Sequence, residues 1–73
     1  MEWQEQYPLS DPRYHTSNIR RMLDDLTRHA RADVRKVDDP RAQALFQTTA
    51  EVLQELARSY EHFERVTEEA WQS

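Results

Sequence analysis

The clearest pattern in this chain is a series of apolar residues spaced alternately three and four positions apart over residues 40–71. Such spacing brings side chains to one face of an α-helix. One stripe consists of Ala42, Phe46, Thr49, Leu53, Leu56, Tyr60, Phe63, Thr67 and Ala70. A second stripe beside it consists of Leu45, Val52 and Val66. The pattern predicts a long helix from Pro40 to about Trp71, with a very wide apolar face.

A shorter stripe of the same kind precedes it. Over residues 12–37 the apolar positions are Ile19, Leu23, Leu26, Ala30, Val34 and Val37. The other side of this segment carries opposite charges four residues apart, such as Arg20 and Asp24, which support a solvated helix face. The pattern predicts a first helix from Pro12 to about Val37.

Residues that break or turn a backbone are scarce, because the chain has no glycine and only three prolines. Asp11-Pro12 and Asp39-Pro40 both look like helix starts, with aspartate as the N-cap and proline at the first helical position. A turn over residues 37–40 is so short that the two helices must be antiparallel neighbours. We therefore expect an all-α fold: an antiparallel two-helix hairpin over residues 10–73, preceded by an aromatic N-terminal arm over residues 1–9.

The apolar face of the second helix is wider than one neighbouring helix can cover. A hairpin without disulfides also buries too little apolar surface to be stable alone. Dimerisation into a four-helix bundle supplies the missing neighbours through one self-complementary patch. We expect a homodimer, and a helical partner protein is the other way to cover this face. The expected interface consists of Leu45, Val52, Leu53, Leu56, Tyr60, Phe63 and Val66.

The net charge of −4 is distributed unevenly. Residues 10–37 carry seven basic and four acidic side chains, a net charge of +3. Residues 38–73 carry three basic and eight acidic side chains, a net charge of −5. Opposite charges favour packing of the two helices side by side, although an exposed ion pair contributes only about 0–1 kcal/mol. Because phosphate contacts dominate nucleic-acid binding, we expect no nucleic-acid partner for so acidic a chain.

The chain has no cysteine, which excludes disulfides and thiolate chemistry. It also has no apolar run long enough for a signal peptide or a membrane span, so a cytoplasmic location without membrane contact is expected. Nine of the ten basic residues are arginine. That bias is typical of GC-rich bacterial genomes.

Histidines are the candidates for metal or proton chemistry. In the expected hairpin His15 is level with His62, with Glu61 close by, and helical bundles hold iron or manganese with such residues. However, no acid lies three residues before His29 or His62, the spacing that dinuclear sites use. His15, Met22 and His29 also share one flank of the first helix. We interpret the histidines as surface residues, with a metal site at His15, His62 and Glu61 as the alternative, and we expect no cofactor.

Aromatic residues gather at the open end of the expected hairpin. In one interpretation the N-terminal arm folds back and covers the last turns of the second helix. In the other, the aromatic side chains bind a peptide or small ligand, because tyrosine and tryptophan dominate interface energetics. The candidate docking residues are Trp3, Tyr7, Tyr14 and Trp71.

No serine has a histidine at a spacing that supports nucleophilic catalysis, and no glycine-rich loop could hold a phosphate. We therefore expect no enzymatic activity. The leading hypothesis is a small interaction or scaffold module that acts by self-association into a helical bundle. The alternative is a metal-binding bundle that uses His15, His62 and nearby carboxylates. A third hypothesis is an acidic surface that occupies a basic site on a larger protein.

Overall fold

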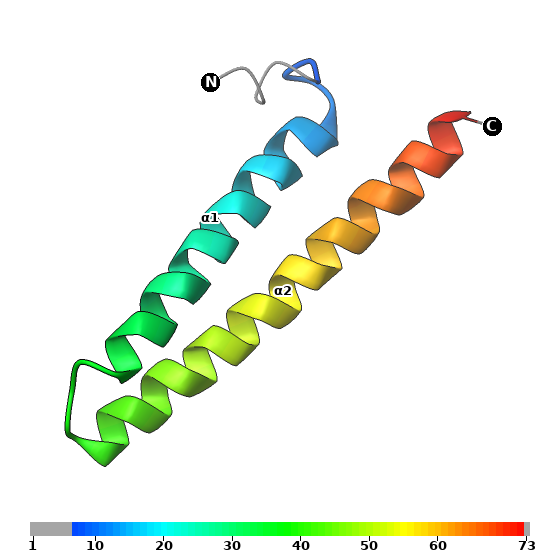
Figure 1. Ribbon diagram of the computed structural model, residues 1–73. Coiled ribbons are helices and arrows are strands. Elements are labelled where there is room, and N and C mark those ends of the chain that lie inside the picture. The colour runs from blue at the N-terminus through cyan, green and yellow to red at the C-terminus, as the bar shows by residue number, and fades with distance from the viewer. Residues whose placement is uncertain (1–6, 73) are drawn as a thin grey trace.

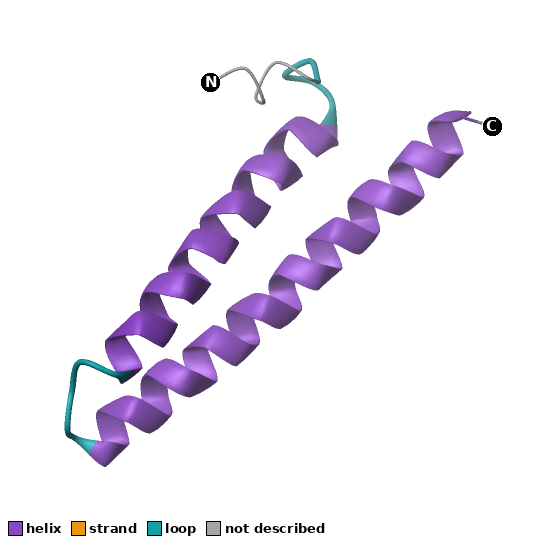
Figure 2. Ribbon diagram, viewed as in Figure 1, coloured by secondary structure: helices purple, strands orange, loops and turns teal. Residues whose placement is uncertain are grey.

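The protein is a hairpin of two antiparallel helices in a computed structural model that describes residues 7–72, with side chains for residues 7–70. Helix α1 spans Pro12–Val34 and helix α2 spans Pro40–Gln72. Figure 1 shows them side by side, with the start of α1 and the end of α2 opposite the linker. The described residues contain no strand (Figure 2). The predicted all-α hairpin is therefore confirmed.

Both helices begin at the aspartate–proline pairs. The Asp11 carboxylate accepts a hydrogen bond from the backbone N–H of Arg13 at 2.9 Å. The Asp39 carboxylate accepts one from the backbone N–H of Arg41, also at 2.9 Å. The proline after each aspartate is the first helical residue. A backbone N–H at that position has no acceptor within the helix, so proline costs no helical hydrogen bond there. The sequence therefore predicted both starts correctly.

Helix α1 ends at Val34, before the predicted end near Val37. The chain has no glycine to end the helix in a left-handed conformation, and no described residue has a positive φ. Instead, the N–H groups of Arg35 and Lys36 bond to carbonyls three residues back, at 3.2 and 3.0 Å. The side chain of Gln43 then donates to the Val37 carbonyl at 2.7 Å. The linker is thus longer than predicted, and α2 starts beyond the last turn of α1 (Figure 1).

The line of contact between the helices, called the seam below, has small side chains at its centre. Ala30, Ala50, Ala57 and Thr27 are buried, with Ala50 only 1 % exposed. No large side chain in the described part of the chain is fully buried. The seam positions are Thr16, Arg20, Leu23, Thr27, Ala30 and Val34 on α1 and Phe46, Ala50, Leu53, Ala57, Tyr60 and Glu64 on α2. Small residues let the helices pack closely, but they leave the hairpin without a large core.

Side-chain hydrogen bonds across the seam show which parts of the helices are level. The Arg20 guanidinium donates to both carboxylate oxygens of Glu64, at 3.0 and 3.3 Å. This contact raises the pKa of Arg20 through the hydrogen bond and the opposite charge. Nearer the linker, Arg31 donates to the side-chain oxygen of Gln54. Met22 on α1 and Leu56 on α2 both lie in the stretch between these two contacts.

The molecule is long and flat. Its principal extents are 51 × 24 × 14 Å and its radius of gyration is 15.5 Å. A compact domain of this length has a radius of gyration of about 11 Å. The accessible surface is 5612 Å², whereas a compact protein of 8.8 kDa exposes about 4,800 Å². The hairpin therefore exposes about 800 Å² more than a compact monomer.

Candidate functional site

The candidate site is a broad apolar surface along one side of the hairpin. On both helices exposed apolar residues directly precede seam residues: Leu26 precedes Thr27, and Leu56 precedes Ala57. Because the helices are antiparallel, the residues that directly precede seam residues lie on the same side of the hairpin in both helices. We call this surface the apolar face. It consists of Ile19, Met22 and Leu26 from α1 and Leu45, Val52, Leu56, Phe63 and Val66 from α2.

The side chains of the apolar face are strongly exposed. Their exposed fractions run from 38 % for Ile19 to 63 % for Leu45. Single exposed apolar residues are common on folded proteins and need no explanation. A contiguous patch that runs along two helices is different, because patches of more than a few hundred Å² mark interaction sites.

Charged residues are sorted between the two sides of α2. Eight positions on the side of the apolar face carry no charge: Leu45, Thr49, Val52, Leu56, Ser59, Phe63, Val66 and Ala70. Eight positions on the opposite side include five charged residues: Ala44, Gln47, Glu51, Gln54, Arg58, Glu61, Arg65 and Glu68. In a chain that is 33 % charged, this sorting suits a face that loses its water, because a buried unpaired charge is costly.

The α1 border of the apolar face carries histidines. His15, Met22 and His29 lie on one flank of α1 and are all exposed. A ring nitrogen of His15 lies 2.9 Å from the carbonyl oxygen of Leu9. The Nε2 atom of His29 lies 3.1 Å from a carboxylate oxygen of Asp33. Each histidine thus has a polar partner within its own chain and forms a polar edge to the apolar surface.

A hollow opens on the apolar face near the open end of the hairpin. Its volume is about 270 Å³, and it is lined by Thr16, Ser59, Tyr60 and Phe63. Ser59 and Phe63 belong to the uncharged side of α2, whereas Thr16 and Tyr60 are seam residues. The hollow is therefore a gap between the helices into which an apolar side chain of an opposing helix can insert, as knobs insert into holes in helical bundles.

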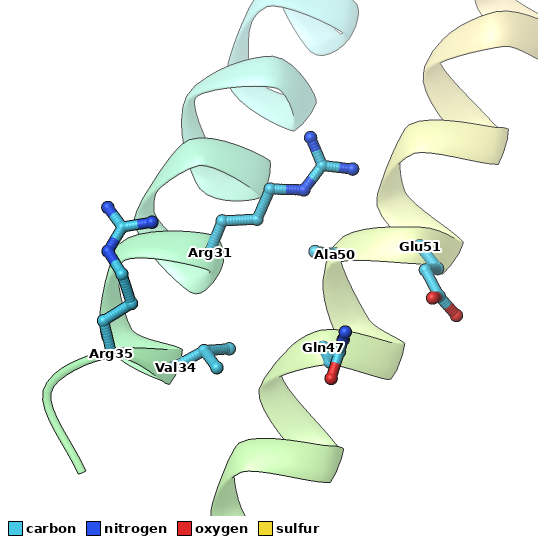
Figure 3. A pocket seen from close by; sticks show the side chains of 6 residues that line it. All are labelled: Arg31, Val34, Arg35, Gln47, Ala50 and Glu51. Atoms are coloured by element: carbon cyan, nitrogen blue, oxygen red, sulfur yellow. The ribbon is translucent and has the colours of Figure 1, made fainter.

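A second hollow lies on the opposite, polar side of the hairpin, near the linker. It has a volume of about 290 Å³ and is lined by Arg31, Val34, Arg35, Gln47, Ala50 and Glu51 (Figure 3). In Figure 3 the Arg31 side chain reaches toward α2, whereas the Arg35 side chain turns away from it. Arg31 already donates to Gln54, and Glu51 adds a negative charge to the rim. The mixed charges favour a solvated surface here.

The residues predicted for the dimer interface fall into two groups. Five of them lie on the apolar face and are exposed: Leu45, Val52, Leu56, Phe63 and Val66. Leu53 and Tyr60 are half-buried in the seam, where they face α1 of the same chain. Ala50 and Ala57, which belong to neither predicted apolar stripe, form the centre of the seam.

Helix α1 contributes more to the apolar face than its sequence pattern indicates. The spacing of Ile19 and Leu26 predicts contact with the second helix, in one stripe with Ala30. The structure leaves Ile19 38 % and Leu26 49 % exposed, because the seam follows Thr27 and Ala30. One sequence signal could have separated the exposed from the buried residues of α1. It is the pairing of small residues, Thr27 and Ala30 on one helix with Ala50 on the other.

The hairpin does not bring the predicted metal ligands together. His15, His62 and Glu61 are all exposed. His15 borders the apolar face, His62 lies on the outer side of α2, and Glu61 lies on the polar side. Within the described residues, no three histidine, cysteine, aspartate or glutamate side chains are grouped closely enough to hold a metal ion.

Of the candidate docking residues, Trp3 and the side chain of Trp71 lie outside the described parts of the chain. Tyr7 is half-buried, and the guanidinium of Arg13 lies 4.4 Å from the centre of its ring. The ring of Tyr14 is also half-buried. The two described tyrosines therefore contribute part of their surface to contacts within the chain.

An ion pair holds the start of α1. The Nη2 atom of Arg13 donates to Asp11 at 2.7 Å, and its Nε atom donates at 3.1 Å. The two side chains are 10 % and 2 % exposed, respectively. The hydrogen bond from Arg13 lowers the pKa of Asp11, and the same contact raises the pKa of Arg13. This pair fixes the guanidinium on which Tyr7 packs.

Neither helix of the described chain combines the length and the apolar character that a membrane span requires. Comparison with known proteins found no matching family model, no matching curated protein and no matching solved structure.

Proposed function

We propose that this protein is a non-enzymatic interaction module that assembles with a second copy of itself into a four-helix bundle. The observation that supports the proposal is the apolar face, which leaves eight large apolar side chains exposed on one side of the hairpin. Small seam residues cannot compensate for this exposure, because they bury little area. A second hairpin that lies face to face with the first removes both apolar faces from water.

The magnitude of the exposed area favours a stable dimer. The hairpin exposes about 800 Å² more than a compact monomer, and a standard protein–protein interface buries about 800 Å² on each partner. The excess exposed area is therefore of the size that one partner buries in a standard interface.

A second copy is the occupant that fits this surface. A two-fold dimer needs only one self-complementary patch, and an uncharged stripe along nearly the whole of α2 can meet apolar residues at any level. A further copy of the hairpin also has the same length as the face that it must cover. The proposal leaves the charged side of α2 in water, where its five charged residues are solvated.

Sedimentation equilibrium of the purified protein at micromolar concentration tests the proposal. We expect twice the mass of the chain for the wild type. In Leu56→Glu a carboxylate is placed at the centre of the apolar face, where burial without a partner is costly. We expect this substitution to raise the dissociation constant of the dimer at least about a hundredfold, since each 1.4 kcal/mol is a factor of ten.

Gln47→Glu is the matched control, because it adds the same charge to the exposed, polar side of α2. It should leave the mass unchanged. Circular dichroism checks that both variants remain helical. A wild-type protein that is helical and monomeric at every concentration would exclude self-association as its function.

A further inference from the structure

We infer that the two hairpins of the dimer lie with their linkers at the same end, so that α1 of each chain packs against α2 of the other. This inference rests on the proposed self-association and specifies how the two apolar faces meet. It follows from the levels of the apolar residues, the position of the hollow and the charges of the two helices.

Two symmetric arrangements bring the faces together. If the two-fold axis runs along the hairpin, the linkers lie at the same end and α1 faces the partner's α2. If the axis runs across the hairpin, the linkers lie at opposite ends, α1 faces the other α1, and α2 faces the other α2. Facing helices are antiparallel in both cases, so helix dipoles do not distinguish the two. Side-chain chemistry has to decide.

The levels of the apolar residues favour the arrangement with both linkers at the same end. On α1 the apolar face consists of Ile19, Met22 and Leu26, which span the middle of the helix, whereas Asp33 occupies the same side near the linker. With the linkers together, every residue keeps its level, and these three residues meet the uncharged side of the partner's α2. With the linkers apart, they meet the other α1, whose same side also carries His15 and Asp33.

The hollow on the apolar face gives a second, independent indication. It lies near the open end, lined by Tyr60 and Phe63 among others. With the linkers together, the partner presents Ile19 and Phe63 at that level, and both are apolar side chains large enough to insert. With the linkers apart, the hollow meets the linker end of the partner, where the same side carries both Leu45 and the carboxylate of Asp33.

The charges of the helices point the same way. Within Pro12–Val34 there are five arginines and three aspartates, a net charge of +2. Within Pro40–Gln72 there are three arginines and six glutamates, a net charge of −3. With the linkers together, each helix has only oppositely charged neighbours. With the linkers apart, α1 packs on α1 and α2 on α2, so helices of like net charge become neighbours with their axes about 10 Å apart, roughly one Debye length.

Distance measurement between spin labels tests the inference directly, because the chain has no cysteine of its own. Asp38→Cys places one label in the exposed linker of each chain. With the linkers together, the labels should lie within about 30 Å of each other, since helix layers are about 10 Å apart. With the linkers at opposite ends, their separation should approach the 51 Å length of the hairpin.

A mixed dimer provides the reciprocal control. A donor dye at Asp38→Cys in one chain and an acceptor dye at Ser10→Cys in the other measure the distance from the linker to the open end. We expect weak energy transfer for this pair and strong transfer when both dyes are at position 38. The opposite result, in a protein that sediments as a dimer, would overturn the inference and leave the proposed function intact. A monomer would contradict both.

Discussion

Single aspartates define where the helices begin. Asp11 and Asp39 each accept a backbone N–H bond at 2.9 Å, and each is followed by a proline at the first helical position. These contacts are local, spanning two residues, so they need no tertiary structure to form. They compensate for a chain that has no glycine with which to mark its turns.

The neighbouring residues Asp38 and Asp39 allow a matched test of the cap. Asp39→Ala removes the side chain that bonds to the Arg41 N–H, and we expect it to lower the free energy of unfolding by about 1 kcal/mol. Asp38→Ala makes the same chemical change at an exposed linker residue and should have a clearly smaller effect. Urea denaturation followed by circular dichroism measures both. Equal losses in the two variants would show that the cap does not stabilise α2.

At the scale of the helices, alanine decides how they pack. Ala50 and Ala57 are one heptad apart and sit at the centre of the seam with Ala30 and Thr27. Small side chains permit close approach of two helices, and their burial leaves the larger apolar residues of α2 on the side of the seam. The wide apolar stripe of α2 is therefore divided between two neighbours, one within the chain and one outside it.

Enlarging a seam alanine tests this division. Ala50→Leu adds three carbon atoms at a position that is only 1 % exposed, and overpacking of this kind destabilises by about 1–3 kcal/mol. Ala44→Leu places the same side chain at an exposed position on the polar side of α2 and should have little effect. Thermal unfolding of both variants measures the difference. A neutral Ala50→Leu would mean that the helices are not in close contact there.

At the scale of the whole molecule, the stability of the hairpin depends on the ratio of buried to exposed surface. The hairpin is 14 Å thick along its shortest axis, too thin to enclose a large side chain from all sides. The pair of facing hairpins that we propose is twice as thick and has an interior for residues such as Leu56. The stability of the fold and its assembly would then depend on each other.

That coupling predicts a melting temperature that depends on protein concentration. Anything that binds the folded chain and not the unfolded chain stabilises the fold by mass action, and a second copy does so in proportion to its own concentration. We expect the melting temperature of the wild type to rise as the protein concentration increases from about 1 to 100 μM. A concentration one hundred times the dissociation constant adds roughly 2.7 kcal/mol to the free energy of unfolding. The Leu56→Glu variant should melt at a lower temperature that changes less with concentration over the same range.

The sequence predicted the candidate site unevenly. Residues such as Leu45, Val52 and Val66 were recognisable because they form a stripe of their own on α2, too far around the helix for one neighbour to cover. Ile19 and Leu26 were not recognisable in the same way. On α1 they belong to the same apolar periodicity as Ala30, and only the position of the partner helix separates exposed residues from buried ones.

The sequence by itself determined the two helices, their starts and their antiparallel order, because N-caps, prolines and apolar periodicity act over a few neighbouring residues. Only the tertiary structure decided which stripe of each helix faces the other. Several apolar positions on α2 compete for that contact, and the choice depends on how closely two helices can approach. Ala50 and Ala57 allow the closest approach, so they occupy the seam, and the larger apolar side chains remain on the face that we propose a second copy covers.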